Sequence, residues 1–227
     1  MAVAISSSVL EPIIHSARLI EYVDELNAIV EQEAARRERF YEEMTDAEKV
    51  EFIEGEVVMH SPARRAHLMV RSNIEYLLRT YVSRNGLGEV HGEKCLCVFP
   101  RNDYEPDVVF FGKDKVTSLD ANTMKFPIPD LVVEVLSEST ERRDRGIKFE
   151  DFEAHGVGEY WIVDADHAVV EQYVRRGTQF ELVMKSNSGH LESKVIAGLR
   201  VLVVAFFQDK ANREEVDRIA DEARSLK

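Results

Sequence analysis

The sequence predicts a small α/β protein in which helices flank a mixed β-sheet. Three observations lead to this prediction. Amphipathic helical segments alternate with short segments rich in Val, Ile and Leu, one of these short segments is apolar almost throughout, and Gly-containing turns join neighbouring strands. A chain of 227 residues can bury one substantial core, so we expect a single domain with extensions rather than two full domains.

The first predicted element is a peripheral helix from Ala17 to about Met44. Its apolar residues recur at steps of three and four: Leu19, Val23, Leu26 and Val30. Residues 31–43 are highly charged and are expected to form a solvated face. The apolar half is expected to pack either on the domain or on a second copy of the chain. Residues 1–45 therefore form an acidic amino-terminal helical arm.

The next elements begin the core of the domain, which we place at residues 46–207. Residues 50–60 read as two short strands about a turn at Glu54-Gly55, and Ser61-Pro62 then breaks the chain. A helix over residues 64–84 follows, with a buried stripe formed by Val70, Ile74, Leu77, Leu78 and Tyr81. Asn85-Gly86 ends this helix in the way that a left-handed cap requires.

The rest of the domain is predicted to consist mainly of strands. After β-rich segments at 89–99 and 106–111, the continuous Val/Leu run within 126–136 indicates a central strand covered on both faces. A helix over 139–155 begins at the capping hydroxyls of Ser139 and Thr140 and stops at Gly156. Further strands are predicted at 159–166, 168–174, 180–185 and 199–207. A charged carboxy-terminal segment, 208–227, follows and is expected to be helical from about residue 212.

The net charge of −13 is unusual for a protein that binds a polyanion, because nucleic-acid binding usually leaves a basic footprint. The acidity is concentrated in the arm. Residues 1–56 hold 14 acidic and 5 basic residues, whereas residues 57–207 hold 22 acidic and 19 basic residues. We therefore expect the arm to point away from nucleic acid.

The sequence argues against a membrane-spanning chain, since no apolar run approaches the roughly 20 residues needed to cross a bilayer. The amino terminus lacks the basic start and unbroken apolar stretch of a secretory signal, so we expect a cytoplasmic protein. Cys95 and Cys97 agree with a reducing compartment. Without a second Cys or His pair nearby, we interpret them as core thiols rather than metal ligands.

Glu134 interrupts an otherwise apolar run from Leu131 to Leu136. An ionised carboxylate left unpaired in a dry site costs several kcal/mol, so it needs a cation, either a side chain or a metal ion. Asp107, in the strand segment PDVVFF, is expected to need a cation for the same reason. Two carboxylates on neighbouring strands suit magnesium, which takes few protein oxygens and keeps several waters. The sequence therefore predicts a metal site at Asp107 and Glu134.

Lys148 is the candidate for a cation that contacts both the metal-bound water and the scissile phosphate. It lies on the helix that follows the Glu134 strand, four residues from Asp144, so these two residues share one helical face. The spacing alone fits an ordinary surface pair between Asp144 and Lys148 equally well. Arg143 and Asp144 are otherwise expected to anchor the start of this helix.

Three ordered segments, EPDVVFF, PDLVVEVLSEST and RRDRGIKFEDFEAHGVGEYWIVD, resemble the signature of the Uma-type putative restriction endonuclease family, a branch of the PD-(D/E)XK nuclease superfamily. The resemblance covers most of residues 36–207. It implies a restriction-endonuclease-like mixed sheet flanked by helices, with Asp107 and Glu134 as metal ligands and Lys148 in the lysine role. Most of the superfamily keeps that lysine two residues after the glutamate, where this chain has Leu136; the resembling branch carries it on the following helix.

Two more residues match the family. Glu51 would orient water or hold a second metal ion, although a glutamate on a strand surface is the simpler interpretation. His67 would contact phosphate, although a lone histidine on a helix is more often a hydrogen-bonded core or rim residue. The resemblance therefore adds both residues to the candidate site.

These residues support one leading hypothesis and two alternatives. The leading hypothesis is hydrolysis of a nucleic-acid phosphodiester, with DNA as the expected substrate and Mg²⁺ or Mn²⁺ held by Asp107, Glu134 and the Val135 carbonyl. The alternatives are a phosphoesterase acting on RNA or nucleotides, and a non-catalytic scaffold for protein contacts that keeps the nuclease fold. A homodimer is the usual expectation for enzymes that cut duplexes.

Overall fold

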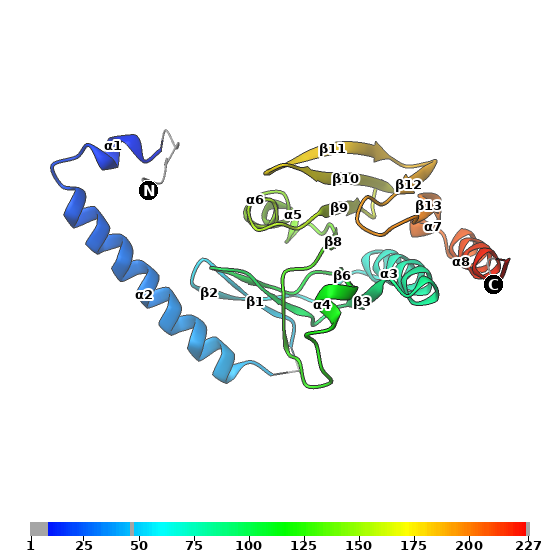
Figure 1. Ribbon diagram of the computed structural model, residues 1–227, viewed down its shortest axis with the longest axis horizontal. Coiled ribbons are helices and arrows are strands. Elements are labelled where there is room, and N and C mark those ends of the chain that lie inside the picture. The colour runs from blue at the N-terminus through cyan, green and yellow to red at the C-terminus, as the bar shows by residue number, and fades with distance from the viewer. Residues whose placement is uncertain (1–8, 46–47, 226–227) are drawn as a thin grey trace.

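The computed structural model describes residues 9–45 and 48–225, which form a mixed α/β fold (Figure 1). The elements up to the middle of the chain are α1 (Glu11–Ile14), α2 (Leu19–Glu43), β1 (Val50–Ile53), β2 (Glu56–Met59), α3 (Arg65–Asn85), β3 (Gly88–Gly92), β4 (Leu96–Val98), β5 (Asp103–Tyr104), β6 (Val108–Gly112) and α4 (Lys113–Val116). The later elements are β7 (Lys125–Phe126), β8 (Leu131–Val135), α5 (Glu141–Asp144), α6 (Ile147–Ala154), β9 (Glu159–Asp164), β10 (Val169–Arg176), β11 (Gln179–Ser186), β12 (His190–Glu192), β13 (Arg200–Leu202), α7 (Val204–Phe207) and α8 (Asp209–Ser225).

Strand β8 lies inside a six-stranded mixed sheet. The strand order is β11-β10-β9-β8-β6-β3, with β8 parallel to β9 and antiparallel to β6. Every residue of β8 is buried. A strand with neighbours on both sides and helices over both faces must be apolar at nearly every position. The prediction of a central strand in a mixed sheet flanked by helices is therefore confirmed.

Side chains along each strand alternate between the two faces of this sheet. One face packs against α3, α7 and α8 and includes Val133 and Trp161. The opposite face packs against α6 and includes Val132 and Ile162. Glu134 has the same parity as Val132, so the strand directs its carboxylate to the α6 side.

A second sheet, with the order β2-β1-β5-β4-β7, adjoins the first. The chain passes from β5 in this sheet to β6 in the central sheet through Glu105, Pro106 and Asp107. This short crossing holds the β1–β2 hairpin close to the start of β6. Asp107 therefore lies where the two sheets meet.

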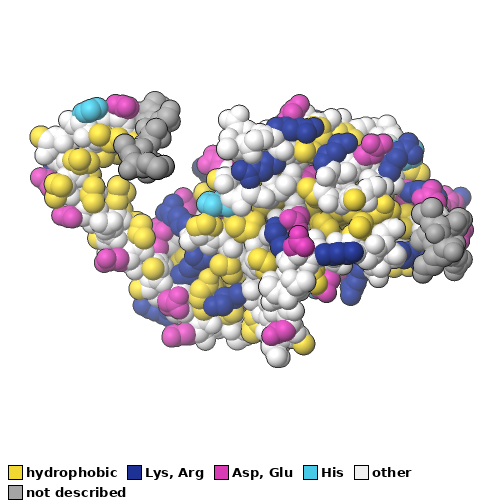
Figure 2. All heavy atoms as spheres, viewed as in Figure 1, with side chains coloured by type: hydrophobic (Ala, Val, Ile, Leu, Met, Phe, Trp, Pro, Cys, Tyr) yellow, Lys and Arg dark blue, Asp and Glu magenta, His cyan; other side chains and the backbone are white. Residues whose placement is uncertain are grey.

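Helix α2 is anchored through its carboxy-terminal half. Arg101, in the β4–β5 turn, donates to Glu33 at 2.7 and 2.8 Å, and Arg37 Nε donates to Asp103 at 2.7 Å. The amino-terminal half projects from the body of the molecule (Figure 1). Its apolar side chains are exposed along the arm (Figure 2), among them Ile20, Val23, Leu26, Ile29 and Val30. The predicted helix is present, but the domain is not the partner of its apolar face.

The predicted strand over residues 89–99 is two strands in two different sheets. β3 pairs with β6 in the central sheet, whereas β4 pairs with β5 and β7 in the second sheet. Between them, Lys94 takes a left-handed conformation with φ of 59° and redirects the chain. A continuous β-rich pattern does not reveal this change of partner, because both strands favour the same residue types.

The predicted helix over residues 139–155 is interrupted. α5 ends at Asp144 and α6 begins at Ile147, with Gly146 between them at φ −113° and ψ −108°. A Cβ atom on Gly146 would lie 2.8 Å from the Arg142 carbonyl oxygen, so only glycine fits this corner. The predicted hydroxyl cap is also wrong, since Thr140 occupies the cap position of α5 without a side-chain capping bond.

The predicted strand over residues 199–207 is strand only in its first part. β13 ends at Leu202, and the following apolar residues form the short helix α7. Ala205 and Phe206 are buried in the core, and Asn212 of α8 donates to the Ala205 carbonyl oxygen at 3.1 Å. An apolar run alone does not distinguish a buried strand from a buried helix.

The two cysteines are core residues, as predicted. Both are buried free thiols, and burial raises the pKa of the Cys97 thiol. Of the helices in the described part of the chain, none combines the length and the apolar character that a membrane span requires.

Candidate active site

Lys148 lies at the centre of a buried cluster of acids. Its Nζ atom is 2.8 Å from Glu134 Oε1, 2.9 Å from Glu51 Oε1 and 3.5 Å from Asp144 Oδ1. All four side chains are buried. The interpretation of Lys148 as a surface partner of Asp144 is therefore wrong, because its closest contacts are two acids from different strands. Glu51 is likewise a buried member of this cluster rather than a surface strand residue.

Asp107 joins the cluster through Glu134. Its backbone amide donates to Glu134 Oε2 at 3.3 Å, and its Oδ2 atom accepts the Val135 amide at 2.9 Å. Its other oxygen, Oδ1, faces the Lys49 ammonium at 3.1 Å and His67 Nε2 at 3.4 Å. The two acids predicted to act together are thus direct neighbours across the β6–β8 pair.

The β1–β2 hairpin contributes the remaining residues of the cluster. Its register pairs Glu51 with Val58, so Lys49, Glu51 and His60 lie on one face of the hairpin. His60 Nε2 is 3.0 Å from Glu51 Oε2. Lys49 and His60 were not among the predicted site residues. Their signal in the sequence is spacing: each lies two positions from Glu51 or from its cross-strand neighbour.

Asp151, one turn after Lys148 on the same side of helix α6, helps to place Lys148. Asp151 Oδ2 accepts Asn102 Nδ2 at 2.7 Å and the Tyr104 hydroxyl at 2.8 Å, which ties the helix to β5. The Lys148 ammonium also lies 5.7 Å from the centroid of the Tyr104 ring. These contacts hold the lysine against the acids, because moving its helix would break two buried hydrogen bonds.

The cluster keeps Lys148 and Glu51 charged. Burial opposes the charge on Lys148, but the neighbouring Glu134, Glu51 and Asp144 outweigh burial and raise its pKa well above the ordinary value. Burial also opposes the charge on Glu51. The Lys148 ammonium and the His60 ring outweigh it and lower the pKa of Glu51 to about 2.

The buried cluster shifts the pKa values of Glu134 and Asp107 in opposite directions. Burial raises the pKa of Glu134 to about 8; Lys148 opposes this rise, and the charges of Asp144 and Asp107 add to it. Burial also acts on Asp107, but His67 and Lys49 outweigh it and hold the pKa of Asp107 below its usual range. Two neighbouring carboxylates with pKa values pushed apart are typical of a functional site.

Asp107 and Glu134 are candidate ligands for a magnesium-like ion, which completes its coordination with water. Within residues 9–45 and 48–225, no three His, Cys, Asp or Glu side chains are arranged to hold a metal ion by themselves. A magnesium ion needs only one or two carboxylates, because it keeps several waters. One buried polar atom of the cluster, His67 Nδ1, lacks a hydrogen-bond partner among the described residues. Asp107 and Glu134 are thus the two carboxylates that could hold such an ion, with the partnerless His67 nitrogen near Asp107.

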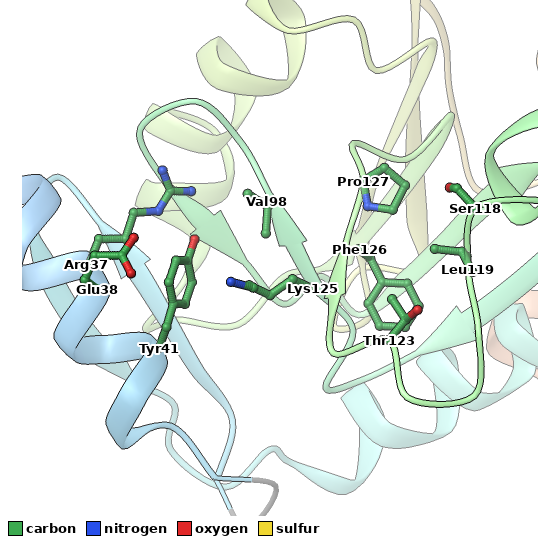
Figure 3. Close-up of a pocket in the computed structure, with 10 residues that line it drawn as sticks. All are labelled: Arg37, Glu38, Tyr41, Val98, Ser118, Leu119, Thr123, Lys125, Phe126 and Pro127. Carbon is green, nitrogen blue, oxygen red and sulfur yellow. The ribbon is translucent and has the colours of Figure 1, made fainter.

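A separate hollow of about 650 Å³ lies between α2 and the segment around β7 (Figure 3). Lys125 crosses it toward Tyr41, with its ammonium 4.1 Å from the ring centroid. No member of the acid cluster lines this hollow, and Arg37 on its wall is bound to Asp103. The hollow is a gap beside the anchored part of α2 and holds no buried pair of acids.

Comparison with solved structures supports the fold. A crystal structure described as a putative nuclease belonging to DUF820, from Anabaena variabilis ATCC 29413, superposes with a TM-score of 0.64. It is 18% identical, and the match covers 74% of this chain and 94% of that chain. Comparison with curated proteins gave no significant match.

A family model covers the part of the chain that carries the cluster. The model, Uma2, is described as "Putative restriction endonuclease" and matches residues 37–203, which is well over half of the chain. This range includes Glu51, Asp107, Glu134 and Lys148 and leaves out the projecting half of α2. The resemblance identified in the sequence is confirmed, and the chain belongs to the Uma2 family of restriction-endonuclease-like proteins.

Proposed function

We propose that this protein is a metal-dependent endonuclease that hydrolyses nucleic-acid phosphodiester bonds, with DNA as its substrate. The observation that carries the proposal is the convergence of Asp107, Glu134 and Lys148 from two strands and a helix. Burying a lysine and several acids costs hydration free energy, and such clusters of perturbed ionisable groups occur often at functional sites. Membership of a restriction-endonuclease-like family agrees with hydrolysis of a phosphodiester.

Asp107, Glu134 and the Val135 carbonyl would hold the metal ion, Mg²⁺ or Mn²⁺. When bound, such an ion lowers the pKa of a coordinated water and offsets negative charge that develops on the phosphate. The Val135 amide fixes the Asp107 carboxylate at 2.9 Å, so this ligand is oriented before an ion arrives. Orientation in advance lowers the entropic cost of binding.

Lys148 would stabilise the transition state and keep the acids in place. Its ammonium is buried, charged and 2.8 Å from Glu134, one of the proposed ligands. A fixed positive charge in a site shielded from water stabilises developing negative charge without rearrangement. Glu51, 2.9 Å from this ammonium and 3.0 Å from His60 Nε2, would orient the attacking water.

A homodimer is part of the proposal, because cutting both strands of a duplex calls for two active sites. The projecting half of α2 carries exposed apolar side chains at steps of three and four residues, as in a helix that packs against another helix. The acidic residues of this segment, Glu21, Asp24, Glu25 and Glu31, lie away from that stripe. A second copy of the same helix can therefore cover the stripe without burying these acids.

Cleavage of labelled duplex DNA, single-stranded DNA and RNA tests the function. The wild type should cut duplex DNA with Mg²⁺ or Mn²⁺ and should be inactive with EDTA. D107N and E134Q should lose at least a thousandfold in rate while keeping the far-ultraviolet circular dichroism spectrum. E181Q, which removes an exposed acid on β11, is the matched control. Full activity in the double variant would refute the assignment, and selective cutting of RNA would replace DNA as the substrate.

A further inference from the structure

The active-site cluster has a buried layer and a partly exposed layer. The side chains of Glu51, Asp107, Glu134 and Lys148 are at most 4% exposed. Lys49 is 20% exposed and His67 is 13% exposed, and both contact Asp107 Oδ1. A phosphodiester that approaches the cluster from solvent therefore meets Lys49 and His67 before it meets Lys148.

The excess of acids over cations in the cluster indicates what this outer layer does when a phosphate approaches. Leaving Glu134 aside, the three carboxylates of Glu51, Asp107 and Asp144 still outnumber the two ammonium groups of the cluster, those of Lys49 and Lys148. A phosphate is an anion, and acids that outnumber cations repel it unless a positive group stands between them. Among these two ammonium groups, Lys49 is the one that solvent reaches.

Lys49 has donors to spare for such a contact. An ammonium carries three N–H donors, and Asp107 Oδ1 takes one of them at 3.1 Å. Lys49 immediately precedes β1, and its carbonyl accepts the His60 amide at 3.1 Å, which fixes the base of the side chain.

We propose that Lys49 is the phosphate-binding residue of the site: it holds a non-bridging oxygen of the nucleic-acid backbone at Asp107, with His67 beside it. This role rests on the proposed nuclease function and adds a substrate contact to it. One N–H of the Lys49 ammonium stays on Asp107 Oδ1, and its remaining donors hold the phosphate oxygen. The same lysine thus contacts Asp107 and the bound phosphate at the same time.

The salt dependence of binding tests the contact without relying on cleavage. Binding of a fluorescein-labelled 20-base-pair duplex is measured by anisotropy in EDTA over a series of salt concentrations. One lost phosphate contact makes the slope of log affinity against log salt shallower by about 0.9. K49Q should show this change, and K49R should restore the wild-type slope. K113Q is the matched control, because Lys113 is exposed and follows the opposite end of β6 from Asp107.

The outcomes separate this inference from the function on which it rests. If the wild type binds and cleaves but K49Q keeps the wild-type slope, the contact is wrong and the nuclease stands. Equal changes in K49Q and K113Q would also overturn the contact, since they would indicate general attraction. A wild type that neither binds nor cleaves nucleic acid overturns both. Thermal melting of K49Q and K49R verifies that both variants are folded.

Discussion

The ammonium of Lys148 and the carboxylate of Glu134 lie 2.8 Å apart in a site that excludes most solvent. The lysine comes from a helix and the glutamate from the central strand, so the fold must close correctly before the pair can form. The two groups do not simply neutralise each other. Burial raises the pKa of Glu134 to about 8, whereas Lys148 remains charged through its contacts with Glu51 and Asp144 as well.

Replacing the two partners of this pair should have unequal effects on stability. K148M leaves Glu51 and Asp144 buried without their cation, so the free energy of unfolding should fall by about 3–5 kcal/mol. E134Q should cost only about 1 kcal/mol at pH 7, because the site already accommodates the neutral form of Glu134. Urea denaturation measures both changes.

The control for this comparison is K210M, which removes an exposed lysine from α8. It should change the free energy of unfolding by less than about 0.5 kcal/mol. Equal losses in K148M and E134Q would show that the lysine serves Glu134 alone. A negligible loss in K148M would show that the acids are not held by it.

The lowered pKa of Glu171 predicts how the free energy of unfolding depends on pH. Burial opposes its charge, but Arg145, Lys185 and Tyr173 outweigh burial and lower its pKa to about 2 from an ordinary 4.5. A carboxylate with a lowered folded pKa stabilises the fold above its unfolded pKa and loses this contribution as the pH falls through the folded value. E171Q should therefore cost about 1.5–3 kcal/mol near pH 7 and much less near pH 2.

Denaturation of wild type and E171Q across this pH range checks the sign. Glu171 matters to the site because Arg145, which donates to it at 2.8 Å, immediately precedes the Gly146 corner between α5 and α6. E181Q, on the neighbouring strand, should show no such pH-dependent difference. A cost that grows toward low pH would contradict the assignment.

The exposed stripe on α2 predicts an effect on assembly rather than on folding. L26E places a charge within the stripe and should convert a dimer to a monomer in light scattering after size-exclusion chromatography. A28E adds the same charge on the opposite face of the helix, about 200° away, and should leave the dimer intact. Neither substitution should lower the melting temperature of the domain by more than about 2 °C. A wild-type protein that is monomeric at high concentration would contradict the dimer.

The sequence predicts which residues come together where one chemical argument covers several of them. Glu134 stands out because it breaks an apolar run, and its strand parity directs it toward the helix that carries Lys148. Asp107 and Glu51 follow from the ordered resemblance to the family. The distances among these residues come only from the fold, because they depend on how two sheets meet at Asp107.

Glu159 shows why a buried acid alone is not enough. It is as buried as Glu134 and opens an equally apolar strand. Its partners are neutral donors, namely Trp161 Nε1 and Gln172 Nε2 at 2.6 Å each, Lys194 N at 2.7 Å and Ser193 Oγ at 2.8 Å. A buried carboxylate in a sequence therefore predicts a partner but not whether that partner is a cation.

Two of the incorrect predictions concern changes of direction. Lys94 and Gly146 each turn the chain inside a segment whose residue pattern is continuous, and neither turn changes the local hydrophobic period. The second of these turns lies between Asp144 and Lys148, which both belong to the cluster. Lys49 and His60 were missed for a related reason: the hairpin was predicted, but its register fixes which residues face the cluster.

Binding of Mn²⁺, measured by isothermal titration calorimetry, tests most directly whether Asp107 and Glu134 form a metal centre. The wild type should bind Mn²⁺ at this site, and D107N should lose that binding while its melting temperature stays within a few degrees of the wild type. E181Q should bind as the wild type does. Identical binding by the wild type and D107N, or no binding by the wild type, would contradict the metal centre and leave the protein as a scaffold with a nuclease fold.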